Sequence, residues 1–281
     1  MPEIPELEAI RGYFNEHLPG RRIVTVETRI PPVFRTPAKE LRETLPGDAF
    51  GDVSRHGKFL LFGLASERVL AINPMLTGRF QYLDPKARLA AKTCLVVAVE
   101  DGRQLRYADD RLMGKVYLVA ADQLAAIPNW ATNGPDLLDP ALTEDAWLAA
   151  IRRYRGAIKG VLTRAEFVQG VGNAYSDEIL WEAKINPYTT RTSLGDEELR
   201  GLFRCAREVM AWATPLARER MVKGDALDYD ERRDFVRVHR RGGQPCPRCG
   251  TAISEITANQ RITSFCRKCQ PGGPSGATLR D

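Results

Sequence analysis

The sequence predicts an α+β protein in which a β-rich domain with one leading helix precedes a helical domain that carries a zinc-binding hairpin. Short apolar or alternating segments between turn residues fill the first part of the chain, and apolar residues at helical spacing follow them. Two Cys-x2-Cys pairs stand near the C-terminus. The 281 residues suit about two domains, and 43% hydrophobic with 27% charged residues is typical of a globular protein.

The first domain is expected over residues 1–130 and begins with a helix over residues 2–18. Pro5 suits the first helical turn, apolar residues recur at helical spacing, and Gly20 ends the pattern. Strands are then expected over residues 22–30, 58–63, 69–73, 79–83, 93–100, 103–108 and 115–119. Short strands at this spacing are typical of a β-sandwich or a barrel.

Turn residues at Asn133-Gly134-Pro135-Asp136 indicate a linker near the start of a helical domain, which is expected over residues 131–235. Thr143 is a suitable N-cap for its first helix, which runs to Arg153. Further helices are expected over residues 159–168, 174–183 and 199–221. The highly charged residues 225–234 predict an exposed loop.

Four cysteines have the spacing of a zinc site. Cys246 and Cys249 form one Cys-x2-Cys pair, Cys266 and Cys269 form the other, and 16 residues separate the pairs. Because protein thiolates fill all four tetrahedral positions, we expect one structural Zn²⁺ and not a catalytic metal.

The segment around these cysteines is expected to form a zinc finger over residues 236–270. The sequence between the pairs predicts a hairpin with strands over residues 252–256 and 260–264 and with Asn259 near its turn. Gly, Pro and Ser are frequent over residues 271–281, which predicts a disordered tail.

The charge balance permits a polyanionic partner, because 41 Lys and Arg against 36 Asp and Glu give a formal net charge of +5. Basic residues crowd residues 232–268, which favours phosphate contacts over a merely solvated surface. No apolar stretch approaches the roughly 20 residues of a membrane span, and acidic residues interrupt the N-terminus where a signal peptide is apolar. We therefore expect a cytoplasmic protein that makes no membrane contact.

A glycine-containing turn, Gly170-Val171-Gly172-Asn173, lies between two expected helices. Its glycines permit close backbone approach, and the amides that start the following helix suit an anion. Asn173 is placed to cap that helix or to donate to a phosphate oxygen. The same residues also fit a simple turn between helices.

The N-terminus, Met1-Pro2-Glu3, contains a potential amine nucleophile beside a carboxyl group. Removal of the initiator methionine leaves Pro2 as a secondary amine, and an α-amino group has a pKa of about 8. Such an amine suits Schiff-base chemistry, with Glu3 beside it as a proton-transfer group. The alternative is that Pro2 only begins the first helix.

Four stretches of the chain carry recognisable motifs: Met1-Pro2-Glu3-Ile4-Pro5-Glu6, Arg55-His56-Gly57-Lys58-Phe59-Leu60-Leu61, Gly170-Val171-Gly172-Asn173-Ala174-Tyr175-Ser176-Asp177-Glu178, and Arg240-Arg241-Gly242-Gly243-Gln244-Pro245-Cys246 through Cys269-Gln270. Together, and in this order, they resemble motifs of the formamidopyrimidine-DNA glycosylase / endonuclease VIII (Fpg/Nei) family. The resemblance implies an N-terminal β-sandwich and a C-terminal helical domain with a helix–two-turn–helix motif and a zinc-ribbon hairpin, which grip DNA between them.

The resemblance also implies catalytic roles. Pro2 attacks C1′ of the damaged nucleotide, and Glu3 transfers protons during sugar opening and base loss. Lys58, Asn173 and Arg261 hold the phosphates that flank the extruded lesion.

Further DNA contacts follow from the same resemblance. Glu6 helps to order the site, and Lys159 is a further phosphate contact. Residues from two loops fill the hole left by the flipped nucleotide: Leu76 or Met75, Arg111, and Met113, which stands where the family usually has phenylalanine.

The implied function is a bifunctional DNA glycosylase/AP lyase of base excision repair. It acts as a nucleoid-associated monomer on damaged double-stranded DNA, with an N-terminal proline Schiff base, β,δ-elimination, and no redox or nucleotide cofactor. The alternative is a zinc-ribbon protein that binds DNA or RNA without chemistry. Pro2-Glu3 together with Lys58 favours the enzyme, because a protein that only binds has no use for them.

Overall fold

The computed structural model describes residues 2–229, 232–258 and 260–272. The chain divides into two compact units, one with residues 1–131 and 214–233, the other with residues 132–213 and 234–281. The long helix α6 (Asp196–Met221) crosses this boundary, so its C-terminal end belongs to the first unit. Residues 214–233, which the sequence analysis assigns to the helical domain, therefore group with the β-rich unit. Within the described residues, no helix is long and apolar enough to cross a membrane.

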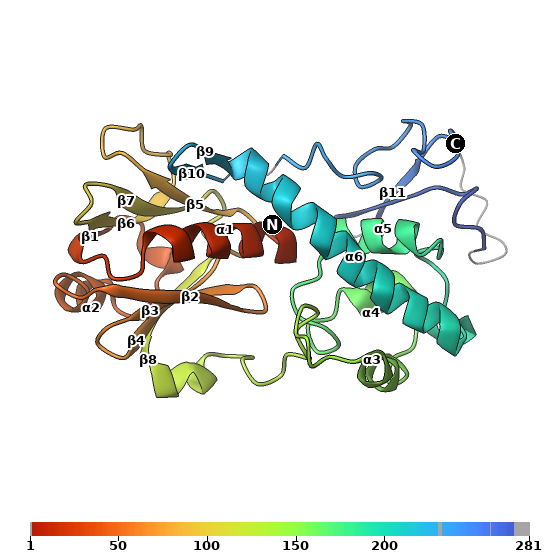
Figure 1. Cartoon of the computed structure of the whole chain (residues 1–281), viewed down its shortest axis with the longest axis horizontal. Helices are drawn as coiled ribbons and strands as arrows, with labels where there is room; N and C mark the ends of the chain where they lie inside the picture. The colour runs from red at the N-terminus through yellow and green to blue at the C-terminus, as the bar shows by residue number, and fades with distance from the viewer. Residues whose placement is uncertain (1, 230–231, 259, 273–281) are drawn as a thin grey trace. The chain divides into compact units, whose positions relative to one another are not determined.

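Helix α1 (Ile4–His17) opens the first unit, as predicted (Figure 1). It starts directly after Pro2 and Glu3. A capping box fixes this start: the Glu3 side chain accepts from the Glu6 backbone N–H, and the Glu6 side chain accepts from the Glu3 N–H at 2.9 Å. The apolar face of α1 is buried. The first residues of the chain are thereby anchored to the domain.

Two antiparallel sheets form the rest of this unit and confirm the predicted sandwich (Figure 1). One sheet contains, in spatial order, β2 (Phe50–His56), β3 (Phe59–Leu64), β4 (Arg68–Asn73) and β8 (Lys115–Ala120). The other contains β1 (Ile23–Thr28), β6 (Thr93–Val99), β7 (Gln104–Asp109), β5 (Gly78–Leu83), β10 (Ala226–Asp228) and β9 (Val222–Lys223). The Phe14 ring of α1 lies 5.3 Å from that of Phe62 in β3 and 6.3 Å from that of Phe80 in β5, so α1 packs against both sheets.

Some elements of this unit are absent from the sequence-based prediction. Strand β2 buries only Phe50 and Val53, and its pairing with β3 shifts register between them, so its sequence lacks a clear alternating pattern. Within residues 1–131, the other unpredicted elements are η1 (Pro31–Val33), α2 (Ala38–Thr44) and η2 (Ala121–Ala126).

The prediction of an exposed loop over residues 225–234 is wrong in its first part. Strand β10 lies in this range and forms a hairpin with β9, which precedes it, and Leu227 of β10 pairs with Tyr82 of β5. Leu227 is completely buried, and the Tyr13 hydroxyl donates to the Asp225 carbonyl oxygen at 2.6 Å. Burial of one leucine and one long-range hydrogen bond thus outweigh the charged composition. Residues 230–231 of this prediction lie outside the described residues.

Helices and the cysteine-bearing hairpin make up the second unit. Its helices are α3 (Glu144–Ile151), α4 (Ile158–Leu162), α5 (Asn173–Glu182), η3 (Arg191–Ser193) and the first part of α6. Thr143 Oγ1 accepts from the Ala146 N–H at 3.1 Å, which confirms the predicted N-cap. Helix α4 is shorter than predicted, because backbone groups of residues 165–169 bond to the linker residues 134–135.

Strands β11 (Ser254–Ala258) and β12 (Arg261–Phe265) form the predicted hairpin, and Asn259 lies outside the described residues. The chain that follows packs on the unit as far as Gly272, because Asn186 Nδ2 donates to the carbonyl oxygens of Gln270 and Gly272 at 3.0 and 2.7 Å. The prediction of disorder is therefore wrong for residues 271–272, and residues 273–281 lie outside the described residues.

Candidate functional site

The N-terminal dipeptide is buried at the start of α1, where Glu3 is only 2% exposed. Glu6 uses both carboxylate oxygens there: Oε2 accepts from the Glu3 N–H at 2.9 Å, and Oε1 accepts from Arg233 Nε at 2.6 Å. A buried carboxylate requires such partners because an unpaired buried charge is costly. The structure therefore brings Pro2, Glu3 and Glu6 together at the start of α1. It adds Arg233 to this group, a residue that its position in a run of charged residues does not distinguish.

Lys58 stands in the tight turn between β2 and β3, after Gly57, whose φ of +57° favours glycine. Arg55 fastens this turn to α1: its Nε donates to Glu8 Oε1 at 2.6 Å, and its Nη1 donates to the Gly57 carbonyl oxygen at 3.0 Å. The ion pair is shielded, since both side chains are largely buried. Helix α1 therefore positions both the N-terminal dipeptide and the turn that carries Lys58.

The residues predicted to enter the DNA lie in two loops of the sandwich. Met75 and Leu76 belong to the loop from β4 to β5, and Arg111 and Met113 belong to the loop from β7 to β8. Both loops connect the two sheets at the same end of the sandwich. Leu76 is half-buried, Arg111 is exposed, and Met113 is 40% exposed.

In the second unit, Lys159 and Asn173 converge on the backbone of β12. Lys159 Nζ donates to the Ile262 carbonyl oxygen and to Thr263 Oγ1, both at 2.9 Å, and Asn173 Nδ2 donates to the same Ile262 oxygen at 2.8 Å. Where the sequence analysis expects a phosphate contact, Lys159 is 11% exposed and also pairs with Asp177 Oδ1 at 2.6 Å. These contacts fix the part of β12 that directly follows Arg261, and the Arg261 side chain itself is exposed.

Two buried acids at the end of the two-turn motif secure the zinc finger, a role that the sequence analysis missed. Asp177 Oδ2 accepts from the Ser264 N–H at 3.1 Å and lies 2.7 Å from His239 Nδ1. Glu178 accepts backbone N–H bonds from residues 237–239 at 2.8–2.9 Å. Burial raises the pKa of Glu178, and these backbone donors act against that rise. Two adjacent acids within a helix whose neighbouring residues are mostly buried are the signal that indicates such an anchor.

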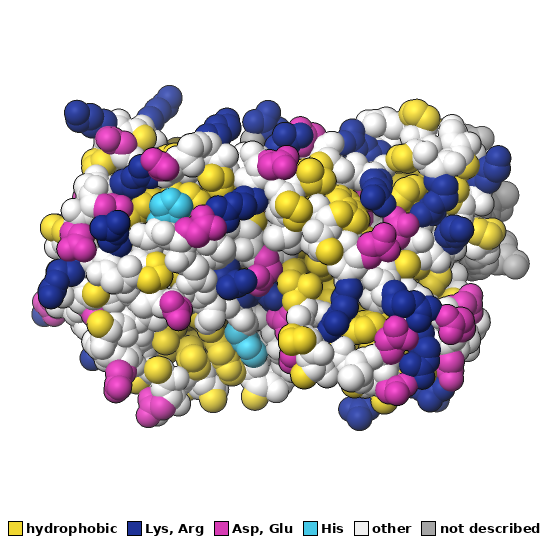
Figure 2. Space-filling model, in the orientation of Figure 1, with side chains coloured by type: hydrophobic (Ala, Val, Ile, Leu, Met, Phe, Trp, Pro, Cys, Tyr) yellow, Lys and Arg dark blue, Asp and Glu magenta, His cyan; other side chains and the backbone are white. Residues whose placement is uncertain are grey.

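Basic residues over α3 and the start of α6 form a different kind of surface. Figure 2 shows Lys and Arg side chains intermixed with Asp and Glu there, at the lower right. Arg200 pairs with Asp145 at 2.5 Å, and Arg204 pairs with Glu144 and Glu197 at 3.1 and 2.6 Å. Because acids neutralise these arginines, this face is a solvated surface and a poor phosphate site.

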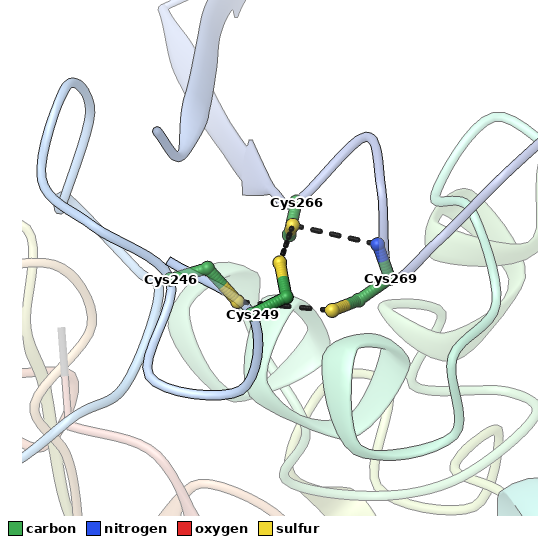
Figure 3. A group of neighbouring side chains, drawn as sticks. All are labelled: Cys246, Cys249, Cys266 and Cys269. Carbon is green, nitrogen blue, oxygen red and sulfur yellow. Dashed lines mark hydrogen bonds between the residues drawn. The ribbon is translucent and has the colours of Figure 1, made fainter. Parts of the chain in front are cut away.

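The four predicted zinc ligands come together in one cluster, where their Sγ atoms all lie within 4.8 Å of one another (Figure 3). The Sγ atoms of Cys246 and Cys269 are 3.9 Å apart, and those of Cys249 and Cys266 are 3.5 Å apart. Four sulfur atoms that bind one zinc ion tetrahedrally lie about 3.8 Å from one another. Trp181 Nε1 of α5 donates to Cys246 Sγ at 3.4 Å, and such N–H···S bonds orient and stabilise zinc-bound thiolates. The soft donor set fits a zinc ion.

Replacing Cys249 with Ser is expected to remove the metal and loosen the hairpin that carries Arg261, because the zinc-binding energy is folding energy for a site of this kind. Elemental analysis should find about one zinc per wild-type chain and far less in the variant. Cys205→Ser, which changes a half-buried thiol on α6, is the matched control and should retain the metal. Metal-free wild-type protein would contradict the assignment.

Three family models match the chain in order: the N-terminal domain of formamidopyrimidine-DNA glycosylase over residues 1–116, its H2TH domain over residues 133–221, and the zinc finger found in FPG and IleRS over residues 243–272. The formamidopyrimidine-DNA glycosylase of Pelotomaculum thermopropionicum is 34% identical over 280 residues, covering 96% of this chain and 99% of that protein. That of Listeria innocua is 33% identical over 273 residues, covering 96% and 100%.

Solved structures agree with the sequence matches. The Lactococcus lactis Fpg in complex with DNA containing an abasic site has a TM-score of 0.86 and 27% identity, covering 96% of this chain and 100% of that one. The wild-type Lactococcus lactis Fpg with N7-benzyl-Fapy-dG DNA has a TM-score of 0.86, 28% identity and the same coverage. Fold, domain matches and cysteine cluster define a zinc-finger DNA-repair glycosylase that binds DNA. The chain belongs to the formamidopyrimidine-DNA glycosylase family.

Proposed function

We propose that this chain excises oxidised bases from damaged double-stranded DNA and then cleaves the strand at the resulting site. The observation that carries this proposal is the N-terminal dipeptide, in which Pro2 precedes the buried Glu3 and Glu6 holds the Glu3 N–H. The Lactococcus lactis complexes with abasic-site DNA and N7-benzyl-Fapy-dG DNA support a damaged duplex as the substrate.

The chemistry follows from a secondary amine beside a carboxyl group. After removal of the methionine, the Pro2 nitrogen attacks C1′ and loses its proton, and the base leaves with the electron pair of the glycosidic bond and takes up that proton. The C1′–O4′ bond then opens, Glu3 supplies the proton to O4′, and an iminium links Pro2 to C1′. Loss of a C2′ proton expels the 3′ phosphate, loss of a C4′ proton then expels the 5′ phosphate, and water hydrolyses the iminium and releases the amine.

Phosphate binding is assigned to Lys58, Arg261 and Asn173. Lys58 stands on the turn that Arg55 fastens to α1, and Arg261 is exposed at the start of β12. Lys159 supports Arg261 indirectly, since its Nζ donates to the carbonyl oxygen of Ile262, the residue directly after Arg261. One Zn²⁺ fixes the base of the same hairpin, and the chain works as a monomer.

Replacing Arg261 with Ala is expected to weaken binding equally for different lesions, because a phosphate contact carries no base information. The slope of log Kd against log salt should fall by roughly one unit. Fluorescence anisotropy with lesion-bearing and undamaged duplexes measures both quantities. Arg21→Ala, a substitution of an exposed arginine in the sandwich unit, should leave the slope unchanged. A loss confined to one lesion would show that Arg261 reads the base.

Single-turnover excision, together with borohydride trapping on an abasic duplex, tests the proposed function. Base release and a covalent protein–DNA adduct are expected from the wild-type chain. Tight binding of damaged duplex without base release or adduct would instead support the zinc-ribbon binding protein.

A further inference from the structure

The two loops that carry the predicted wedge residues are neighbours in the fold. The loop from β4 to β5 spans residues 74–77, and the loop from β7 to β8 spans residues 110–114. Gly78 pairs with Asp109 at one side of the loops, and Asn73 pairs with Lys115 at the other. The strand register therefore brackets both loops between the same two strand pairs.

A single buried carboxylate joins these loops. Asp109 is 0% exposed, and its Oδ1 accepts from Thr77 Oγ1 at 2.5 Å and from the Arg111 N–H at 3.1 Å. Its Oδ2 accepts from the Gly114 N–H at 2.6 Å. The Arg111 N–H also reaches Thr77 Oγ1 at 3.0 Å, which closes a small ring of hydrogen bonds between the loops. Charge-assisted bonds of this kind are stronger than neutral ones.

Both loops are held in shapes that ordinary residues resist. Met75 and Leu112 have φ values of +49° and +55°, in the left-handed region. A Cβ on Gly78 would lie 2.4 Å from the Pro74 carbonyl oxygen, and a Cβ on Gly114 would lie 1.9 Å from the Tyr107 hydroxyl. Strained backbone of this kind persists only where surrounding contacts determine it. Here the Asp109 network supplies those contacts.

We infer that Asp109, through Thr77, clamps the two loops into one rigid wedge, so that Leu76 and Arg111 enter the DNA stack as a unit. This inference rests on the proposed function. Extrusion of a base must be offset by the groups that replace it, and a preorganised wedge avoids the entropy cost of ordering two loops at that moment. Asp109 and Thr77 are positioning residues, because they act through the loops and not on the reacting atoms.

Thr77→Val tests the clamp, because it removes the bridging hydroxyl and keeps the shape of the side chain. The rate of excision from a duplex is expected to fall about tenfold, which corresponds to the loss of one hydrogen bond to a charged group. Borohydride trapping by Thr77→Val on a single strand that contains an abasic site should stay within about twofold of the wild-type level. A single strand has no complementary base whose stacking the wedge must replace. The matched control is Thr36→Val, since Thr36 Oγ1 likewise makes long-range hydrogen bonds: it donates to the carbonyl oxygen of Leu118 in β8 and accepts from the Leu118 N–H. It should change neither rate.

Two further measurements separate a clamp from general support of the fold. Fluorescence of 2-aminopurine beside the lesion should report slower unstacking with Thr77→Val than with the wild-type chain. The effects of Thr77→Val and Leu76→Ala on duplex excision should be less than additive, because both act through the same wedge. Equal losses on duplex and single strand, unchanged unstacking, or additive effects would overturn the clamp. A wild-type chain that releases no base and traps on neither substrate would overturn the proposed function instead.

Discussion

Adding residues before Pro2 is expected to abolish imine formation and strand cleavage, lowering both by roughly a thousandfold or more. An extension converts the Pro2 nitrogen into a tertiary amide, whose lone pair is delocalised into the carbonyl group and cannot attack C1′. Borohydride trapping on an abasic duplex and gel analysis of strand nicking measure the loss.

The control for this prediction carries the same residues after Asp281 and should react as the unextended chain does. Duplex binding by the N-terminally extended protein separates lost chemistry from lost affinity. Full trapping and nicking with a blocked N-terminus would mean that the nucleophile lies elsewhere.

Glu3→Gln is expected to lower base excision by about a hundredfold to ten-thousandfold, the usual contribution of a positioned acid–base group. The amide has the size of the carboxylate and can still accept the Glu6 backbone N–H in the capping box, so α1 should start at the same residue. What is lost is the proton that Glu3 passes to the opening sugar.

A preformed abasic site has no base to release, and its sugar already equilibrates with the ring-opened aldehyde, so it bypasses the step that Glu3 assists. Glu3→Gln should therefore impair trapping on abasic DNA less than it impairs excision from a damaged duplex. Single-turnover kinetics on the two substrates measures this difference. Glu16→Gln, which changes an exposed acid of α1 paired with Arg218, is the control and should leave both rates unchanged. Excision by Glu3→Gln at the wild-type rate would remove Glu3 from the mechanism.

Local pattern predicted most of the fold, because α1 and most sandwich strands carry their own periodicity. Where the conformation of a segment depends on contacts with distant residues, its own sequence pattern is weak. Strand β2 buries few apolar residues, and β10 is a strand only because Leu227 pairs with β5. The chain at Gln270 and Gly272 packs through the Asn186 amide and through the buried Gln270 side chain, whose Nε2 donates to the Ile185 carbonyl oxygen at 2.9 Å.

The candidate site shows the same division. The cysteine pairs, the Pro2-Glu3 dipeptide and the two-turn motif are compact in sequence and could be predicted. The contact of Arg233 with Glu6 joins residues 227 positions apart, and that of Arg55 with Glu8 joins residues 47 positions apart. Neither contact follows from local composition. Lys159 makes a further long-range contact, since its ammonium donates to the Ile262 carbonyl oxygen and to Thr263 Oγ1 of β12, 103 and 104 positions away.

The identity of the adducted residue tests the central claim most directly. The wild-type chain is reacted with an abasic duplex, reduced with borohydride, digested with a protease and nuclease, and analysed by tandem mass spectrometry. The account predicts one modified peptide, beginning at Pro2, with the reduced sugar remnant on its N-terminal nitrogen. An adduct on a lysine such as Lys58, with the N-terminal peptide unmodified, would contradict it.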